Sequence, residues 1–270
     1  MNNQPIGIFD SGIGGLSILG EIKSTLPNEN LIYIGDTAYL PYGTKSKKII
    51  TERAHKICNY LIGQQCKSIV VACNTATSAA IHELRINFSV PIIGIEPAIK
   101  PATQSTKSRI IGILATQATL EGDKLSTLKQ KFGQDITILH ESCLGLVEEI
   151  ELGNQQSQTL KNLVEIYVRP LIEQGADTLV LGCSHYPLIR TLIQKCAGDD
   201  VIILDPSLSV AQELKRQLDT KKLLEESNSG TTNCSQTGDS KTCSQTGDSK
   251  TFEIFIEKSK LKYGSSLLTI

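Results

Sequence analysis

The chain has 270 residues, of which 40% are apolar and 20% are charged, so it can bury one large core or two modest ones. Lys and Arg total 27 against 28 acidic residues, which excludes the basic surface typical of proteins that bind nucleic acid or anionic membranes. The sequence has no leader-like segment and no apolar run near the ~20 residues of a membrane span. We therefore expect a cytoplasmic protein with a small-molecule ligand, no nucleic-acid partner and no membrane contact.

The eight cysteines are spread along the chain without a Cys-x-x-Cys pair, and the four histidines show no metal-ligand spacing. In a chain of this length without a secretion signal, such cysteines are expected to be free thiols. The sequence thus predicts no disulfide framework and no metal site.

Short runs rich in Ile and Val alternate with segments that carry apolar residues at helical spacing, a pattern typical of an α/β fold with parallel sheets. The predicted strands lie near residues 6–9, 31–34, 68–72, 92–95, 109–115, 136–139, 178–181 and 201–204. The predicted helices between them include residues 46–64, 120–132, 158–174 and 208–218.

Two halves of this pattern resemble one another. Ile-Gly-Ile-Phe-Asp10-Ser precedes Ile-Val-Val-Ala-Cys73, and Ile-Gly-Ile-Leu-Ala-Thr116 precedes Leu-Val-Leu-Gly-Cys183, with spacings of 63 and 67 positions. Open α/β sheets bind ligands at the carboxyl ends of their strands. The repeat therefore predicts two pseudosymmetric open parallel-sheet domains, with the active site in the cleft between them.

Proline interrupts strand-like runs near residues 97–101 and at 206, which we take as the domain boundaries. The first α/β domain is then expected to comprise residues 1–97 plus 207–270, and the second residues 98–206.

Residues 225–251 contain no Ile, Leu, Val, Phe or Met, and the nonapeptide Cys-Ser-Gln-Thr-Gly-Asp-Ser-Lys-Thr occurs twice in tandem, at 234–242 and 243–251. A segment of this composition buries too little apolar surface to order its backbone. We interpret 225–251 as a flexible loop lengthened by duplication, in which Cys234 and Cys243 are incidental.

Cys73 and Cys183 each follow a buried strand and precede a helix start, where backbone N–H groups and the helix dipole are expected to lower a thiol pKa. The alternative for any cysteine is that of a small buried apolar residue, which we retain for the other strand and helix cysteines, Cys58, Cys66, Cys143 and Cys196.

Two facing thiols suit either disulfide redox chemistry or two-base proton transfer. Redox pairs are usually close in sequence, whereas 110 residues separate Cys73 from Cys183, so proton transfer is favoured. One thiolate would remove a proton from a carbon acid while the other thiol supplies one to the opposite face, without a cofactor.

The loop that begins with Asp10 is glycine-rich, but it lacks the GxGxxG spacing and a P-loop Lys, which disfavours a dinucleotide or nucleotide ligand. Asp10 could also serve only as a turn former or helix cap. Because the loops at 10–15, 41–44, 73–77 and 183–185 hold no basic residue except His185, substrate carboxylates are expected to bind backbone amides and hydroxyls.

Four segments, 7–16, 35–46, 72–76 and 181–188, together resemble the glutamate racemases of the aspartate/glutamate racemase superfamily. The similarity extends over roughly residues 6–218. It implies interconversion of L- and D-glutamate without pyridoxal phosphate, another cofactor or metal, and a supply of D-glutamate for bacterial peptidoglycan.

The resemblance also implies roles for single residues. Cys73 and Cys183 would be the two bases, assisted by Asp10 and His185, and Glu151 would be a further acidic residue for which Glu148 and Glu149 are alternatives. The expected substrate contacts are Asp10, Ser11, Tyr42, Gly43, Asn74, Thr75, Thr116, Thr119, Ser184 and His185. Ser184 stands where the family more often has Thr, which retains the hydroxyl.

Two alternatives remain open at this point. One is an aspartate racemase or another two-cysteine member of the superfamily, and the other is a catalytically silent module that binds an amino acid. The expected partner is the small-molecule substrate, L- or D-glutamate. The sequence leaves open whether the chain forms a homodimer.

Overall fold

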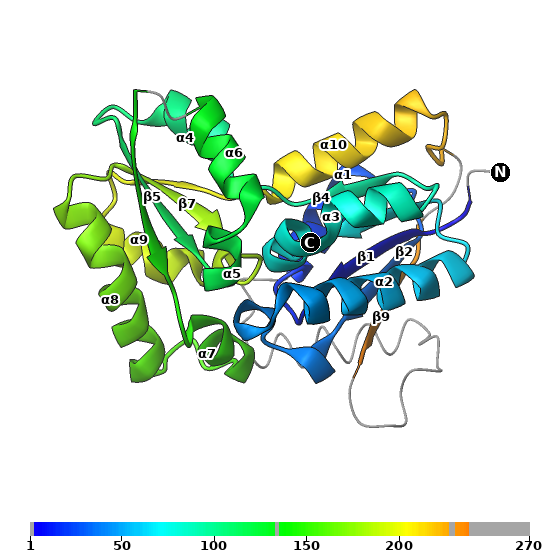
Figure 1. The fold of residues 1–270 in the computed structure, drawn as a ribbon, viewed down its shortest axis with the longest axis horizontal. Helices are drawn as coiled ribbons and strands as arrows, with labels where there is room; N and C mark the ends of the chain where they lie inside the picture. The colour runs from blue at the N-terminus through cyan, green and yellow to red at the C-terminus, as the bar shows by residue number, and fades with distance from the viewer. Residues whose placement is uncertain (1–2, 133–134, 227–229, 238–270) are drawn as a thin grey trace.

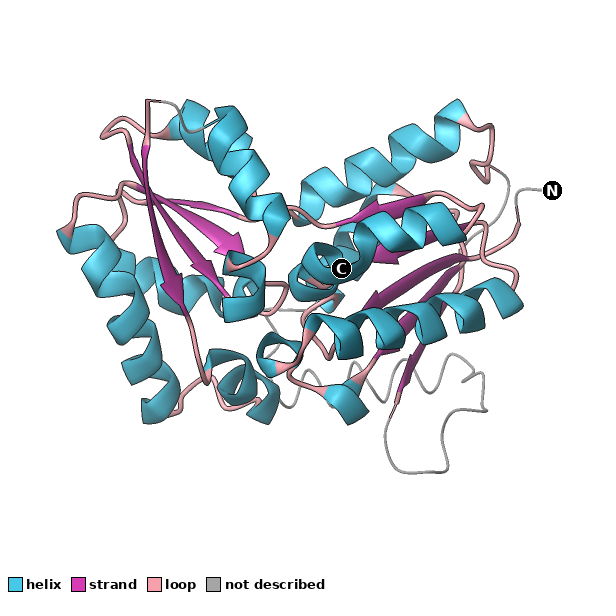
Figure 2. Ribbon diagram, in the orientation of Figure 1, coloured by secondary structure: helices cyan, strands magenta, loops and turns pink. Residues whose placement is uncertain are grey.

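A computed structural model of the chain describes residues 3–132, 135–226 and 230–237, and it contains two parallel sheets flanked by helices (Figures 1 and 2). Sheet A has the strand order β4-β3-β1-β2-β9 and sheet B has the order β6-β5-β7-β8. The strands of sheet A are β1 (Ile6–Asp10), β2 (Leu31–Gly35), β3 (Ser68–Val71), β4 (Ile92–Gly94) and β9 (Thr232–Gln236). Those of sheet B are β5 (Ile110–Ala115), β6 (Thr137–Ser142), β7 (Thr178–Gly182) and β8 (Ile202–Leu204). The eight predicted strands and the α/β class are confirmed.

Alternation along the strands divides the core of sheet A into two layers. Ile6 and Ile8 pack with α1 (Leu16–Thr25) and α10 (Ser207–Thr220) on one face. Phe9 packs with α2 (Lys47–Gly63) and α3 (Asn74–Asn87) on the other.

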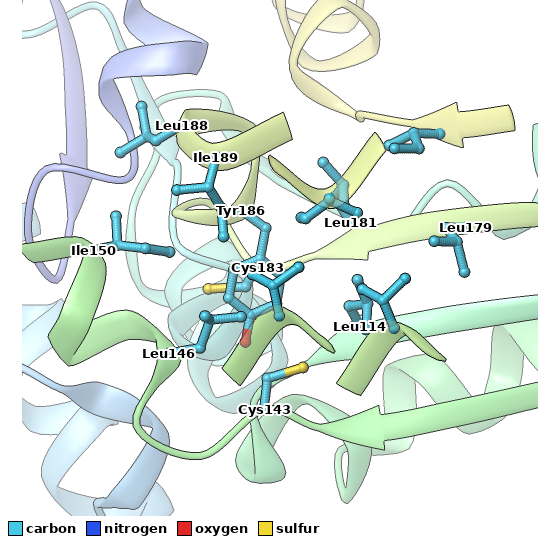
Figure 3. Packing of buried hydrophobic residues seen from close by; sticks show 14 of the residues in the cluster. Leu114, Cys143, Leu146, Ile150, Leu179, Leu181, Cys183, Tyr186, Leu188 and Ile189 are labelled. Atoms are coloured by element: carbon cyan, nitrogen blue, oxygen red, sulfur yellow. The ribbon is translucent and has the colours of Figure 1, made fainter. Parts of the chain in front are cut away.

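Sheet B is covered in the same way. On one face Ile111 and Ile113 pack against α4 (Ile99–Ser105) and α6 (Asp123–Phe132). The other face, with Leu114 and Leu181, is buried by α7 (Leu146–Leu152), α8 (Gln158–Glu173) and α9 (Arg190–Ala197), and Figure 3 shows this cluster reaching Cys183. The remaining helical turns are η1 (Thr37–Tyr39), η2 (Tyr42–Thr44), α5 (Gln117–Leu120) and η3 (Tyr186–Ile189).

The pseudosymmetry predicted from the repeated strand ends is present in the topology. Four strands of sheet A run β4-β3-β1-β2, and the strands of sheet B, read in the same sense, run β8-β7-β5-β6. The glycine shared by the two repeats is explained by packing, because a Cβ at Gly7 would stand 2.8 Å from Leu61 and one at Gly112 would stand 2.7 Å from Leu179. Each central strand thus needs glycine where a leucine side chain lies over it.

The interpretation of residues 225–251 as a loop is wrong for residues 232–236, which include the start of the first nonapeptide copy. Residues 232–236 form β9, which pairs in parallel with β2 at the edge of sheet A and places Cys234 opposite Tyr33. Cys234 is buried with Tyr33 in the core layer under α1 and α10, so it is not incidental. Only one of the five side chains of β9 is buried, so this strand is ordered mainly by its backbone hydrogen bonds to β2. The second copy, with Cys243, lies outside the described residues.

The predicted domain boundaries remain predictions, although α10 packs on sheet A as the expected 207–270 segment of the first domain should. Within the described ranges, no helix is both long enough and apolar enough to cross a bilayer.

Candidate active site

One pocket lies where the carboxyl ends of the two sheets meet. It is lined by residues that follow β1, β3, β5 and β7, and neither Lys nor Arg is among the lining residues of the described chain. The residues that line it are Ser11, Pro41, Tyr42, Gly43, Thr44, Cys73, Thr75, Thr116, Gln117, Cys143, Leu144, Gly145, Val147, Glu148, Cys183, Ser184 and His185. Both candidate bases therefore open onto one pocket, as the repeat predicted.

Cys73 is the N-cap of α3, and its Sγ accepts a hydrogen bond from the amide of Ala76 at 3.5 Å. Its thiol is 3.9 Å from Oγ of Ser11. Burial and the negative charge of Asp10 raise the pKa of Cys73 well above its usual value, and the contacts with Ala76 and Ser11 lower it by less. The prediction of a lowered pKa is thus wrong for Cys73, because its thiol is buried in the apolar layer under α2 and α3 and lies near the charge of Asp10.

Cys183 belongs to a chain of three side chains. Its Sγ lies 3.9 Å from Nδ1 of His185, and Nε2 of His185 lies 2.6 Å from Oε1 of Glu151. Burial disfavours the charged imidazole, but the hydrogen bonds to Cys183 and Glu151 and the charge of Glu151 outweigh it and raise the pKa of His185 well above its usual value. The arrangement resembles a nucleophile, a base and a group that orients the base.

Asp10 joins the two domains. Its Oδ2 accepts hydrogen bonds from the amides of Gly12 and Gly15 at 3.2 and 3.1 Å, and its Oδ1 accepts one from Oγ of Ser184 at 3.0 Å. The carboxylate is fully buried, so these contacts replace its hydration. Asp10 thus shapes the glycine loop and binds the residue next to Cys183.

The same loop lies so close to the second domain that a Cβ would displace side chains there. A Cβ at Gly12 would stand 2.0 Å from Oε1 of Glu151, and one at Gly14 would stand 2.4 Å from Nδ1 of His185. The glycines of this loop thus allow its backbone to approach the side chains that serve Cys183.

Three buried threonines form a hydroxyl cluster between the two halves. Oγ1 of Thr116 lies 2.9 Å from the hydroxyls of both Thr75 and Thr119. The buried amide of Asn74, next to Thr75, has neither its oxygen nor its nitrogen hydrogen-bonded. An orphaned buried amide is costly, which makes Asn74 a candidate to bind a ligand.

The loop that carries Tyr42 and Gly43 is anchored by the buried carboxylate of Asp36. Asp36 accepts hydrogen bonds from Arg53 at 2.7 and 2.9 Å, from the Tyr42 hydroxyl at 2.5 Å and from Thr237 at 2.5 Å. Burial alone would raise the pKa of Asp36, but the bonds from Arg53, Thr237 and Tyr42 lower it. The sequence pointed to neither Arg53 nor Thr237.

Most of the predicted substrate contacts line the pocket, but Asp10, Asn74 and Thr119 are not among its lining residues. Of the three competing acids, Glu151 contacts His185, Glu148 lies on the pocket wall and Glu149 accepts a bond from Ser157.

Several residues of the wall were not predicted as site residues, and they are Gln117, Cys143, Leu144, Gly145 and Val147. Cys143 is buried as expected in the apolar cluster of Figure 3, with a pKa that burial raises to about 12, yet it also lines the pocket. Among the residues that the structure describes, no group of three or more His, Cys, Asp and Glu side chains could hold a metal ion.

Known proteins are similar to this chain in sequence and in fold. The model of the Asp/Glu/hydantoin racemase family matches residues 15–214. The glutamate racemase of Methylococcus capsulatus is 46% identical over 223 residues, which are 83% of this chain and 82% of the relative.

Two crystal structures of glutamate racemases superpose well. The enzyme of Francisella tularensis with D-glutamate has a TM-score of 0.77 at 32% identity and covers 88% of this chain and 90% of its own. The enzyme of Escherichia coli with L-glutamate has a TM-score of 0.76 at 30% identity and covers 86% of this chain and 88% of its own.

The fold and the family match together define an isomerase of the amino-acid racemase class. The chain belongs to the Asp/Glu/hydantoin racemase family.

Proposed function

We propose that this chain interconverts L- and D-glutamate by proton transfer at Cα between two cysteines, without a cofactor, and supplies D-glutamate for peptidoglycan. The observation that carries the proposal is that Cys73 and Cys183, the corresponding strand-end residues of two pseudosymmetric halves, line one pocket. The glutamate racemases to which the chain is similar support the choice of substrate.

In this mechanism the thiolate of one cysteine removes the Cα proton and leaves the C–H electron pair on Cα. The thiol of the other cysteine then gives its proton to Cα from the opposite face, so the configuration inverts and the thiolate is now the second cysteine. We assign Cys183 to L-glutamate and Cys73 to D-glutamate.

The environments of the two thiols differ in a way that suits this assignment. The raised pKa of Cys73 keeps it a neutral thiol, ready to donate a proton. Cys183 instead faces Nδ1 of His185, and an imidazolium there would stabilise a thiolate by a charge-assisted hydrogen bond. Glu151 holds that imidazolium through Nε2. These contacts support the assignment of Cys183 as the base toward L-glutamate.

Asp10 is proposed to assist the other base, Cys73. Its charge contributes to the raised pKa of Cys73, and a thiolate of higher pKa is a stronger base once it has formed. Asp10 would thereby assist the abstraction of the proton from D-glutamate. Its hydrogen bond to Ser184 couples this assistance to the wall that carries Cys183.

Recognition of the two substrate carboxylates is expected to use neutral donors. The pocket wall offers the hydroxyls of Ser11, Thr75, Thr116 and Ser184, and the start of α3 adds backbone N–H groups. The unpaired amide of Asn74 supports its role as a further donor.

The test is the loss of optical rotation when the purified chain is incubated with L-glutamate and, separately, L-aspartate, without added cofactor. We expect the L-glutamate signal to decay to zero in the wild type and in the matched control Cys196→Ser, whose thiol lies on α9 away from the pocket. Decay with L-aspartate alone would indicate an aspartate racemase, and binding of glutamate without any decay would indicate a silent binding module.

A further inference from the structure

One peptide bond in the glycine loop is held from both sides. The carbonyl of Gly12 accepts a hydrogen bond from the hydroxyl of Tyr33 at 2.6 Å. The amide that belongs to the same peptide unit, that of Ile13, donates to Oε1 of Glu151 at 2.9 Å. Because a peptide unit is planar, the bond from Tyr33 also sets the direction in which the Ile13 N–H points.

That N–H and His185 share one acceptor. Oε1 of Glu151 lies 2.9 Å from the amide of Ile13 and 2.6 Å from Nε2 of His185, whose Nδ1 faces Cys183. An unbroken series of contacts therefore runs from Tyr33 in the first sheet to Cys183 in the second.

The surroundings of Tyr33 allow little freedom. Tyr33 lies in β2 between Ile8 of β1 and Cys234 of β9, and its side chain is fully buried. A Cβ at Gly35 would stand 2.9 Å from the Gly12 carbonyl oxygen, so glycine at position 35 leaves room for the loop to lie on the strand. Burial and the nearby charge of Asp10 raise the pKa of Tyr33 well above its usual value, which keeps the phenol a donor.

We propose that Tyr33 is a positioning residue for racemisation, which acts from the core of the first domain through the Gly12–Ile13 peptide and Glu151 to orient His185 against Cys183. The inference rests on the function proposed above. It assigns to Tyr33 an effect on the proton abstracted by Cys183 and none on the proton abstracted by Cys73.

The two half-reactions can be separated with β-chloro-glutamate. When a thiolate takes its Cα proton, the C–H electron pair forms a Cα–Cβ double bond and chloride leaves with the C–Cl pair, so the second thiol is not needed. The enantiomer that Cys73→Ser still processes identifies the substrate of Cys183. Chloride release is then measured for Tyr33→Phe, which keeps the ring and removes the hydroxyl, and for the control Tyr60→Phe on α2.

We expect Tyr33→Phe to lower kcat for the Cys183 enantiomer by about 2- to 12-fold, the factor that matches one buried hydrogen bond. The KM and the rate with the other enantiomer should be unchanged, and Tyr60→Phe should match the wild type. Equal losses for both enantiomers, or no loss for either, would overturn the assignment.

A double-mutant cycle tests the route independently of any loss of stability. In a Glu151→Gln background, Tyr33→Phe should cause no further selective loss. A loss as large as in the wild-type background would show that Tyr33 does not act through Glu151. If the wild type itself releases no chloride and racemises nothing, the proposed function fails, which is a different result from an active wild type with an unaffected Tyr33→Phe.

Discussion

The substitution Gly12→Ala tests whether contact between the glycine loop and the second domain supports catalysis. A Cβ at this position would stand 2.0 Å from Oε1 of Glu151, whereas contacts under 3.0 Å are essentially never seen, so the carboxylate must retreat by about 1 Å. That movement breaks its 2.6 Å contact with His185 and its 2.9 Å contact with Ile13. Since Gly12 does not have a positive φ, alanine adds no backbone strain and the effect is steric.

We expect a displacement of this size to lower kcat for glutamate about 10- to 100-fold. The lost charge-assisted hydrogen bond should reduce the free energy of unfolding by about 1.5–3 kcal/mol. Polarimetry gives the first quantity and urea unfolding the second. The matched control is Gly63→Ala at the end of α2, where a Cβ meets nothing within 4 Å and activity should be unchanged. If Gly12→Ala kept more than about a third of wild-type kcat, the contact with Glu151 would not matter for catalysis.

Cys234→Ser should lower the free energy of unfolding by about 1–3 kcal/mol in a urea titration, because it buries a hydroxyl in an apolar layer, whereas Cys243→Ser in the identical second nonapeptide should change it by less than about 0.5 kcal/mol. Deleting one nonapeptide leaves the same sequence whichever copy is removed, and should cost less than about 1 kcal/mol; a larger loss in calorimetry would show that the second copy packs on the body. Glu151→Gln should lower the pKa of His185 in an NMR titration, since the carboxylate helps to raise it. A raised folded-state pKa stabilises the fold below the unfolded value of about 6.5 and ceases to do so as the pH rises through the folded value, so this variant should be destabilised at pH 6 and approach the wild type at alkaline pH. Equal destabilisation at both pH values would contradict the role of His185 charge.

The inner strands β1, β3, β5 and β7 could be predicted because their apolar runs are buried on both faces of parallel sheets. β9 could not be predicted in this way, because an edge strand is ordered by backbone pairing. Only one of the five side chains of Thr232–Gln236 is buried, so the strand has no apolar run. Thr237, the residue after β9, donates to the buried carboxylate of Asp36, a contact that likewise becomes visible only in the fold.

In the site, too, some features could be predicted from the sequence and others needed the fold. Cys73 and Cys183 could be located from their positions at repeated strand ends, but the pKa of Cys73 depends on tertiary burial and on the nearby charge of Asp10, which no local pattern reports. Tyr33 was missed because it contacts a backbone carbonyl, and such a partner leaves no side-chain signature in the sequence. Glu151 was found by resemblance, and its contact with His185 needed the fold.

The measurement that tests the central claim most directly is chloride release from each enantiomer of β-chloro-glutamate by Cys73→Ser and Cys183→Ser. Replacing either thiol by a much less acidic hydroxyl should abolish racemisation of glutamate by at least the ~10²–10⁴ typical of a lost general base. Each variant should nevertheless keep elimination with one enantiomer, the D form for Cys183→Ser and the L form for Cys73→Ser. Elimination from the same enantiomer by both variants, or wild-type racemisation by either, would contradict a site in which each thiol serves one face of Cα.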